Sequence, residues 1–275
     1  LFWLVLVGSV AVGQFIEIIS LFAIVMIHEI GHFAAAKYFG WRVTEIQILP
    51  FGGVAKVEEN GNVPVKEEII VALAGPLQNG LMIVIAFLFF RVGIWSAEWS
   101  TFFIHANVTL ALFNLLPIYP LDGGKVVQCL MSLWMNYRVA IDRSLQWSIF
   151  ISFILLIASL GPGPLPIQLQ LAGMSIFFIW TSWVALKHAH YQFLRFLIGR
   201  HRGVKNKRRQ IAFPLIVSPA MKIIDVAMML YRDRYHVIYI TETNGDIREV
   251  IPEEKLLSFY FEYKMPGSAI GQLLS

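Results

Sequence analysis

Long apolar runs, separated by short polar segments, dominate the first 190 residues of the chain. A membrane-spanning helix needs about 20 mostly apolar residues. The candidate spans are residues 1–13, 16–36, 69–90, 101–118, 145–160 and 168–186. Between the last two lies Gly161–Pro166, which is too rich in glycine and proline to continue a helix and predicts a tight external turn. The pattern therefore predicts an α-helical polytopic membrane protein with about six transmembrane helices.

The composition supports the same fold class. Of the 275 residues, 57% are hydrophobic and only 15% are charged, whereas soluble domains are about 45–50% apolar and about 25% charged. A water-soluble protein of this size would have to expose much of that apolar excess. A soluble domain and a disordered chain are therefore excluded. The single cysteine also excludes a disulfide framework and a cysteine-based metal cluster.

Basic residues alternate between the connecting loops. Residues 37–68 contain four Lys or Arg residues and residues 119–144 contain three, while the intervening loops contain only Arg91. Because basic loops remain on the cytoplasmic side, we expect both termini to be cytoplasmic. A further basic cluster, Arg200–Arg209, follows the last apolar run and favours an anchor on anionic membrane lipid. A nucleic-acid surface is the weaker alternative, because no aromatic residues or binding fold accompany it, so no nucleic-acid partner is expected.

The composition changes to that of a small globular module from about residue 212. Pro219–Arg232 has helical spacing, and two strands, Tyr235–Ile240 and Ile247–Ile251, flank an Asn244-Gly245 turn. A final helix begins at Pro252. We therefore expect a membrane domain over 1–190, a basic juxtamembrane linker over 191–211 and an α/β cytoplasmic module over 212–275. So small a module is weakly self-sufficient, and we expect it to dock on a second copy of the chain or on a partner.

Three ionisable residues, His28, Glu29 and His32, lie inside the second apolar run. Such residues are costly in a membrane and indicate a functional site. Positions i and i+4 share one face of a helix, so the two histidines can bind one ion, and imidazole suits zinc. Glu29 can then take a proton from metal-bound water. A histidine pair that only hydrogen bonds between helices is the alternative, but it leaves the glutamate unexplained.

Asp122 is the candidate for a third metal ligand. It lies in the run Asn114–Gly124, where two prolines and a Gly-Gly pair break the helix. Backbone that is not helical is tolerated at membrane depth only beside protein or water. The spacing alone supports equally well that Asp122 caps a helix beginning near Gly124. His105 could also reach a metal, but its place near the external end of its span favours a hydrogen-bonding role.

The His28–His32 and Asn114–Gly124 motifs together resemble those of the site-2 protease family, zinc metalloproteases that cut substrates within or beside the membrane. The resemblance implies that His28, His32 and Asp122 bind Zn²⁺ and that Glu29 is the general base. Ala74–Asn79 is similar to a third family signature.

That third signature implies that Asn79 lines the substrate path, although a simple Gly-Pro kink would fit the segment nearly as well. Pro50–Gly53 resembles the family's membrane-associated hairpin, whose strand edge pairs with extended substrate. Asn79 or Asn114 would donate to the oxyanion. The substrate-binding residues implied in this way are Asn79, Asn114, Pro117, Phe51, Gly52, Gly53 and Val54.

The layout of six spans and one small cytoplasmic module is similar to that of family members that act during sporulation. This implies a sigma-factor precursor as substrate, small membrane inhibitory proteins as partners, and a place in the outer membrane surrounding the forespore. The module resembles half of a CBS pair, which often binds adenine nucleotides. The positions that usually contact ribose hold Glu249, Pro252 and Lys255. ATP is therefore possible only through other contacts, and a docking or dimerising role fits equally well.

Two other function classes remain open. A membrane metal transporter could use His28, His32 and Asp122 as transport ligands, but it would not need Glu29 between them. A non-catalytic membrane scaffold would keep the spans and the module and would tolerate loss of the motif. Replacement of Glu29 by glutamine distinguishes these classes from a protease.

Overall fold

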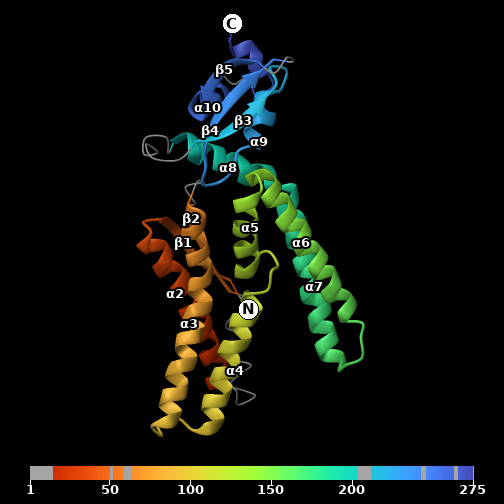
Figure 1. The fold of residues 1–275 in the computed structure, drawn as a ribbon. Helices are drawn as coiled ribbons and strands as arrows, with labels where there is room; N and C mark the ends of the chain where they lie inside the picture. Colours follow the sequence, from red (N-terminus) through yellow and green to blue (C-terminus); the bar gives the residue numbers. More distant parts are fainter. Residues whose placement is uncertain are drawn as a thin grey trace. The chain divides into compact units, whose positions relative to one another are not determined.

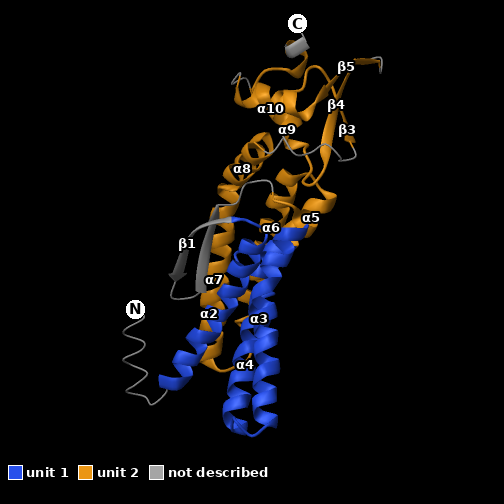
Figure 2. Cartoon of the chain, turned by 90° about the vertical axis from the view of Figure 1, so that its left-hand side faces the viewer, with its two compact units in different colours: residues 1–59, 66–126 blue, residues 60–65, 127–275 orange. Residues whose placement is uncertain are grey.

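The computed structural model is mainly helical and carries a small sheet near the C-terminus (Figure 1). It describes residues 15–49, 52–58, 63–202, 212–242, 246–262 and 266–274. The chain forms two compact units, shown in different colours in Figure 2. Unit 1 comprises residues 1–59 and 66–126, and unit 2 comprises residues 60–65 and 127–275. The two units divide within a helix, and the predicted domain boundaries at 190 and 211 remain predictions.

Unit 1 is built from long apolar helices and one hairpin. Its elements are α2 (Phe15–Tyr38), β1 (Arg42–Leu49), β2 (Gly52–Glu58), α3 (Val65–Arg91), α4 (Ala97–Asn114) and the start of α5 (Asp122–Trp134). Helix α2 ends at Tyr38, and Gly40 follows with a φ of +73°, a left-handed conformation that glycine adopts readily. The strands β1 and β2 pair antiparallel, with Leu49 opposite Gly52.

The described residues contain four helices that are long and apolar enough to cross a membrane, namely α2, α3, α6 (Tyr137–Ala158) and α7 (Leu165–Lys187). These match four of the predicted spans. The predicted span 101–118 is also helical, as α4, but it ends at Asn114 and is not among the four. The predicted span 1–13 lies outside the described residues. A total of six crossings therefore remains a prediction.

In unit 2, α6 and α7 pack against each other on either side of the predicted Gly-Pro turn. The buried positions include many serines, which let the two backbones approach closely, as is common between membrane helices. Their hydroxyl groups donate to carbonyls one turn earlier in the same helix, for example Ser148 to Ser144 at 3.0 Å and Ser175 to Leu171 at 2.7 Å. The hydroxyls are thereby satisfied without water.

The C-terminal module of unit 2 contains a three-stranded sheet. Its elements are β3 (Ala212–Val217), α9 (Ile223–Met228), β4 (Tyr235–Thr241), β5 (Ile247–Pro252), α10 (Glu253–Phe261) and the 3-10 helix η2 (Ile270–Leu274). The strand order is β3-β4-β5, parallel for the first pair and antiparallel for the second. The two predicted strands and the final helix are present. Helix α9 is shorter than the predicted 219–232, the Asn244-Gly245 turn lies outside the described residues, and the CBS resemblance remains a prediction.

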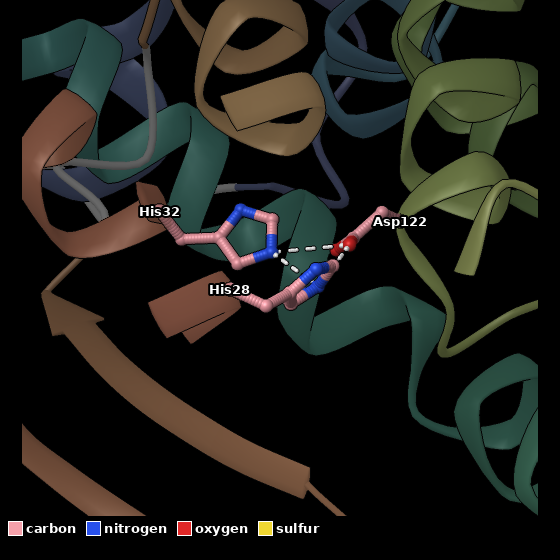
Figure 3. Close-up of side chains that lie close together, drawn as sticks. All are labelled: His28, His32 and Asp122. Carbon is pink, nitrogen blue, oxygen red and sulfur yellow. Dashed lines mark hydrogen bonds and ion pairs between the residues drawn. The ribbon is translucent and has the colours of Figure 1, made fainter. Parts of the chain in front are cut away.

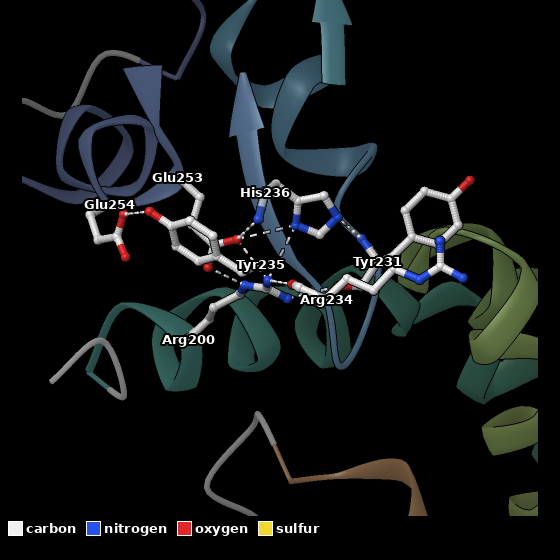
Figure 4. Close-up of polar contacts among 7 residues, drawn as sticks. All are labelled: Arg200, Tyr231, Arg234, Tyr235, His236, Glu253 and Glu254. Atoms are coloured by element: carbon white, nitrogen blue, oxygen red, sulfur yellow. Dashed lines mark hydrogen bonds and ion pairs between the residues drawn. The ribbon is translucent and has the colours of Figure 1, made fainter. Parts of the chain in front are cut away.

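Helix α8 (Ala189–Arg202) joins α7 to this module through Arg200, whose side chain is only 1% exposed (Figure 4). Its guanidinium donates from Nε and Nη2 to the carboxylate of Glu253, at 2.5 and 2.6 Å, and to the carbonyls of Tyr231 and Arg234. The prediction that Arg200 belongs to a lipid-facing basic cluster is therefore wrong, because Arg200 is buried against a carboxylate. Arg202, at the end of α8, is exposed, and the remaining basic residues of that cluster lie in 203–211, outside the described residues.

The same buried network includes His236, and Tyr235 lies next to it in β4. The backbone N–H of His236 and its Nδ1 each lie 3.1 Å from Glu253, and the N–H of Tyr231 donates to His236 Nε2. Nearby, the Tyr235 hydroxyl donates to the carboxylate of Glu254 at 2.8 Å. Burial and this hydrogen bond raise the pKa of Tyr235 to about 12. Arg200, His236 and Glu253 thus join α8, β4 and α10 by polar contacts that are almost fully shielded from solvent, and the Tyr235–Glu254 contact is partly exposed.

We expect Glu253→Gln to destabilise unit 2 by about 3–5 kcal/mol, because removing one partner leaves the other charge buried and uncompensated. Urea unfolding of the purified 275-residue chain, followed by limited proteolysis, measures this change. The matched control is Glu249→Gln, because the Glu249–Lys255 pair is half exposed and its loss should cost less than about 1 kcal/mol. Equal effects of the two substitutions would contradict this account of Arg200.

Candidate metal centre

Three side chains from two helices converge at one point in unit 1 (Figure 3). His28 and His32 lie one turn apart on α2, and Asp122 is the first residue of α5. The two Nε2 atoms are 3.2 Å apart, and Asp122 Oδ2 lies 3.3 Å from Nε2 of His28 and 3.1 Å from Nε2 of His32. His28 is 2% exposed and Asp122 5% exposed. The predicted ligand set is therefore assembled in a buried place.

The outer nitrogen of each imidazole is already engaged. Nδ1 of His32 donates to the carbonyl oxygen of Val71 at 2.7 Å, and Nδ1 of His28 donates to Oδ1 of Asn79 at 2.5 Å. In a neutral imidazole only one nitrogen carries a hydrogen, so both Nε2 atoms present lone pairs. Within the described part of the chain, buried Asp122 Oδ2 has no hydrogen-bond donor. Three electron-rich atoms thus face one another, an arrangement suited to a metal cation.

The spacing of these atoms fits zinc. Zn–N distances are about 2.0–2.1 Å, so in a tetrahedral site neighbouring ligand atoms are about 3.3–3.4 Å apart. The three distances in the cluster, 3.1, 3.2 and 3.3 Å, are close to that value. Two imidazoles and one carboxylate also form the ligand type of catalytic zinc sites, which leave the fourth position for water. Nζ of Lys125 lies 3.4 Å from Oδ1, the carboxylate oxygen of Asp122 that does not contact the histidines.

Glycines allow α3 to approach α2 at the cluster. A Cβ atom at Gly31 would lie 2.6 Å from Cγ of Gln78 and 2.7 Å from the carbonyl oxygen of Ala74. At Gly75 it would lie 2.7 Å from Nε2 of His28 and closer still to the His32 ring. Contacts this short do not occur in real structures, so both positions require the absence of a side chain. The close packing of α3 on α2 at this point therefore depends on the two glycines.

The start of α5 is placed by the break between the two helices. Helix α4 ends at Asn114, the Tyr119–Pro120 peptide is cis, and α5 begins directly at Asp122. Cβ atoms at Gly123 and Gly124 would collide with backbone atoms of Leu115–Tyr119. The two glycines therefore let the first turn of α5 pack on the break. Of the two interpretations of Asp122, the geometry supports the metal ligand, because Oδ2 points at both imidazoles.

The remaining predicted site residues are placed as follows. Glu29 is half-buried on α2, and Asn79 is fully buried against His28. Asn114 donates to the carbonyl of Leu110 at 3.1 Å, and Pro117 is exposed within the helix break. Gly52, Gly53 and Val54 belong to β2, and Phe51 lies outside the described residues. His105 is exposed on α4 and is not part of the cluster. The substrate roles of these residues remain predictions.

Two contributors to the site were not predicted from the sequence. The carbonyl of Val71 orients His32, and no side chain could have signalled a backbone acceptor. Asn107, which is fully buried on α4, donates to Phe103 and accepts from Asn79. A polar residue inside an apolar run was the available signal for Asn107.

We expect Gly75→Ala to weaken zinc binding at least about tenfold, an effect of the size seen when groups that orient metal ligands are changed. The new methyl group would push the two imidazoles apart or move α3 away from α2. Zinc content of the purified protein and competition with a chelator measure the effect. Gly80→Ala is the control, because Gly80 lies on the same helix with open space around it. Unchanged zinc affinity in Gly75→Ala would contradict this packing argument.

Comparison with known proteins agrees with this site. The model of peptidase family M50 matches residues 16–97 and 90–159. Stage IV sporulation protein FB of Bacillus subtilis is 33% identical over 272 residues, which cover 99% of this chain and 93% of that protein. Zinc metalloprotease MJ0392 of Methanocaldococcus jannaschii is 34% identical over 122 residues, or 43% of this chain and 35% of that one.

Among solved structures, the site-2 protease from Methanocaldococcus jannaschii shares the fold. The TM-score is 0.53 and the identity 24%, with 67% of this chain and 86% of that chain covered. The family match spans the helices that carry His28, His32 and Asp122. The chain therefore belongs to peptidase family M50 and is a zinc metalloprotease of the site-2 type.

Proposed function

We propose that this protein is an intramembrane endopeptidase in which Glu29 is the general base, and that it cleaves the precursor of a sporulation sigma factor. The observation that carries the proposal is the convergence of His28 and His32 of α2 with Asp122 of α5, with Glu29 next to His28 in the middle of α2. The proposed orientation has both termini in the cytoplasm, and the proposed location is the outer membrane surrounding the forespore.

The three ligands would hold zinc through the two Nε2 atoms and Asp122 Oδ2. When bound, zinc supplies a Lewis acid for the scissile carbonyl and lowers the pKa of a coordinated water from 15.7 towards about 7. The protein's own part is to keep both Nε2 lone pairs directed at one point. The hydrogen bonds to Val71 and Asn79 support this role, because they fix each imidazole ring through Nδ1, the nitrogen that does not face the metal site.

Glu29 is proposed to transfer a proton from the attacking water to the departing amine. Helix α2 contains only two other charged residues, Glu17 in its first turn and Lys37 in its last. A carboxyl group midway between them is costly in a membrane and calls for a functional explanation. We assign to its carboxylate oxygen the acceptance of a proton from the attacking water. The same oxygen then delivers that proton to the nitrogen of the departing amine, which completes hydrolysis.

The oxyanion donor is proposed to be Asn114. Two asparagines were candidates from the sequence. Asn79 is 0% exposed, and its amide is held between His28 and Asn107. Asn114 is only half-buried and ends α4 where the helix breaks, eight positions before the ligand Asp122. A donor at the edge of the break can meet a substrate carbonyl more readily than one enclosed between helices.

Substrate is proposed to bind as an extended strand. The peptide bonds of a helix are hidden in its own hydrogen bonds, so cleavage requires local unwinding. The hairpin β1–β2 is a two-stranded sheet, and the outer edge of a sheet can pair with an added strand. Gly52 and Gly53 in β2 would let the substrate backbone approach closely.

The sporulation substrate is supported by resemblance and by a relative's name. The Bacillus subtilis relative is called a sporulation protein, and the match covers nearly all of both chains. The sigma-factor precursor, the membrane lipid environment and small inhibitory membrane proteins follow from the layout described above. A metal transporter and a non-catalytic scaffold are the competing classes that an experiment must separate.

We expect Glu29→Gln to reduce cleavage by at least about 10²–10⁴-fold while zinc content stays unchanged, because only the proton acceptor is removed. The test is co-expression with a tagged candidate precursor, with cleavage followed on gels and zinc measured in the purified protein. A transporter would still carry metal after this substitution, and a scaffold would be indifferent to it. Cleavage at the wild-type rate in Glu29→Gln would refute the assignment.

We expect the double substitution Gly52→Val, Gly53→Val to lower cleavage at least about tenfold, which is about 1.4 kcal/mol of substrate binding. Valine keeps the strand propensity but adds a side chain on each face of β2. Zinc content should not change. Gly173→Val is the control, because Gly173 on α7 has open space around it. Wild-type cleavage by the double variant would exclude β2 as the substrate edge.

A further inference from the structure

We propose that Asn107 and Asn79 form a positioning relay for His28, which we call the asparagine relay. Through hydrogen bonds it fixes which nitrogen of His28 carries the hydrogen, and so keeps Nε2 free for metal. The relay rests on the proposed function only in that His28 is a zinc ligand. It assigns to Asn79 a role in holding the metal site, in place of the substrate contact that the sequence suggested.

The direction of the relay is set by a backbone carbonyl. Nδ2 of Asn107 donates to the carbonyl oxygen of Phe103 at 2.9 Å. Because a carbonyl can only accept, the Asn107 amide must place its NH₂ group there and its oxygen on the other side. That oxygen accepts from Nδ2 of Asn79 at 3.1 Å. Oδ1 of Asn79 is thereby turned to His28, 2.5 Å from Nδ1.

This orientation dictates the state of the imidazole. An amide oxygen only accepts, so Nδ1 of His28 must be the nitrogen that carries the hydrogen. Nε2 then has a lone pair directed at Nε2 of His32 and Oδ2 of Asp122. If the Asn79 amide rotated by 180°, its NH₂ group would face Nδ1 and favour hydrogen on Nε2. His28 in that form could not bind metal.

The two histidines differ in a way that explains why a relay is needed. His32 donates to the carbonyl of Val71, which is part of helix α3 and cannot turn round. His28 donates instead to the side-chain amide of Asn79. A rotation of that amide by 180° exchanges its oxygen and its NH₂ group with almost no change in shape. Asn107 removes this ambiguity by accepting from Asn79 on the far side. The second asparagine therefore supplies the directionality that a backbone carbonyl supplies for His32.

The burial of the relay argues that its hydrogen bonds are formed. Asn79 and Asn107 are both 0% exposed, and they lie on α3 and α4 among apolar residues. An unpaired amide in such surroundings is costly. The alternative is that the two buried amides only bridge α3 and α4. In that case they would stabilise the fold but would not specifically change the affinity for zinc. The affinity for zinc, measured apart from stability, separates these two roles.

The experiment compares zinc affinity in variants of the purified 275-residue chain, all carrying Glu29→Gln so that proteolysis plays no part. Zinc is titrated against a chromophoric chelator in detergent, and thermal unfolding is measured without metal. We expect Asn79→Leu to weaken zinc binding by about 10–100-fold. Asn107→Leu should weaken it less, because Asn79 remains but is free to turn. Asn107→Asp should restore affinity at a pH where the buried acid is protonated, since a protonated carboxyl group can donate to the carbonyl of Phe103 and still accept from Asn79.

A double substitution tests whether Asn107 acts through Asn79. In the Asn79→Leu background, Asn107→Leu should cause no further loss of zinc affinity, because the group it orients is already gone. Ser100→Ala is the control, a buried polar residue on the same helix whose hydroxyl has no hydrogen-bond partner among the described residues. Its zinc affinity should equal that of the parent protein.

Several outcomes would overturn the relay. One is a lower unfolding temperature of Asn107→Leu with unchanged zinc affinity, which would indicate packing alone. Another is an equal loss of affinity in Asn107→Asp and Asn107→Leu, and a third is an additive loss in the double variant. These results are independent of the proposed function. A protein that binds zinc with the expected dependence on both asparagines, but cleaves no precursor, would keep the relay and refute the protease substrate.

Discussion

The structure of unit 1 depends on three lone pairs that meet at one point inside a buried site. Two imidazole nitrogens 3.2 Å apart, with a carboxylate oxygen at 3.1–3.3 Å from both, repel one another unless a cation lies between them. Metal binding and the packing of α2, α3 and the start of α5 are therefore coupled. The same coupling explains the glycines at positions 31, 75, 123 and 124. A side chain at any of them would collide with the neighbouring segment and keep the helices that carry the ligands apart.

Each unit contains a buried polar network whose members are partners for one another. In unit 1, the amides of Asn79 and Asn107 and the imidazole of His28 form a chain that ends on a backbone carbonyl. In unit 2, the Arg200 guanidinium is satisfied by Glu253 and two carbonyls. The two networks follow the same rule, that a buried polar group is tolerated when its hydrogen bonds are complete. In unit 1 the network orients a metal ligand, and in unit 2 it joins α8 to the sheet module.

Features that depend on one short segment of the chain could be predicted from the sequence. Contacts between residues far apart in the sequence could not. The apolar runs predicted α2, α3, α6 and α7, because length and hydropathy are properties of one segment. His28 and His32 could be paired for the same reason, since four residues make one helical turn. Asp122 lies 90 positions after His32. The helix break made it a candidate third ligand but supported a helix cap equally well, and the family resemblance and then the geometry favoured the ligand. Strand β3 was missed because Pro214 interrupts its apolar pattern, and Arg200 because its carboxylate partner lies in another element.

Helix α3 emerges as the element that aligns the two histidines. The carbonyl of Val71, the missing side chain of Gly75 and the amide of Asn79 recur every four residues, so they form one stripe on the helix face that meets α2. Two ligands are thus held by a rigid pair of helices, whereas the third is delivered by a helix break. Backbone without regular hydrogen bonds at membrane depth requires surrounding protein or water. A hydrolase needs water at its metal, so the break that brings Asp122 to the histidines also suits the site to its reaction.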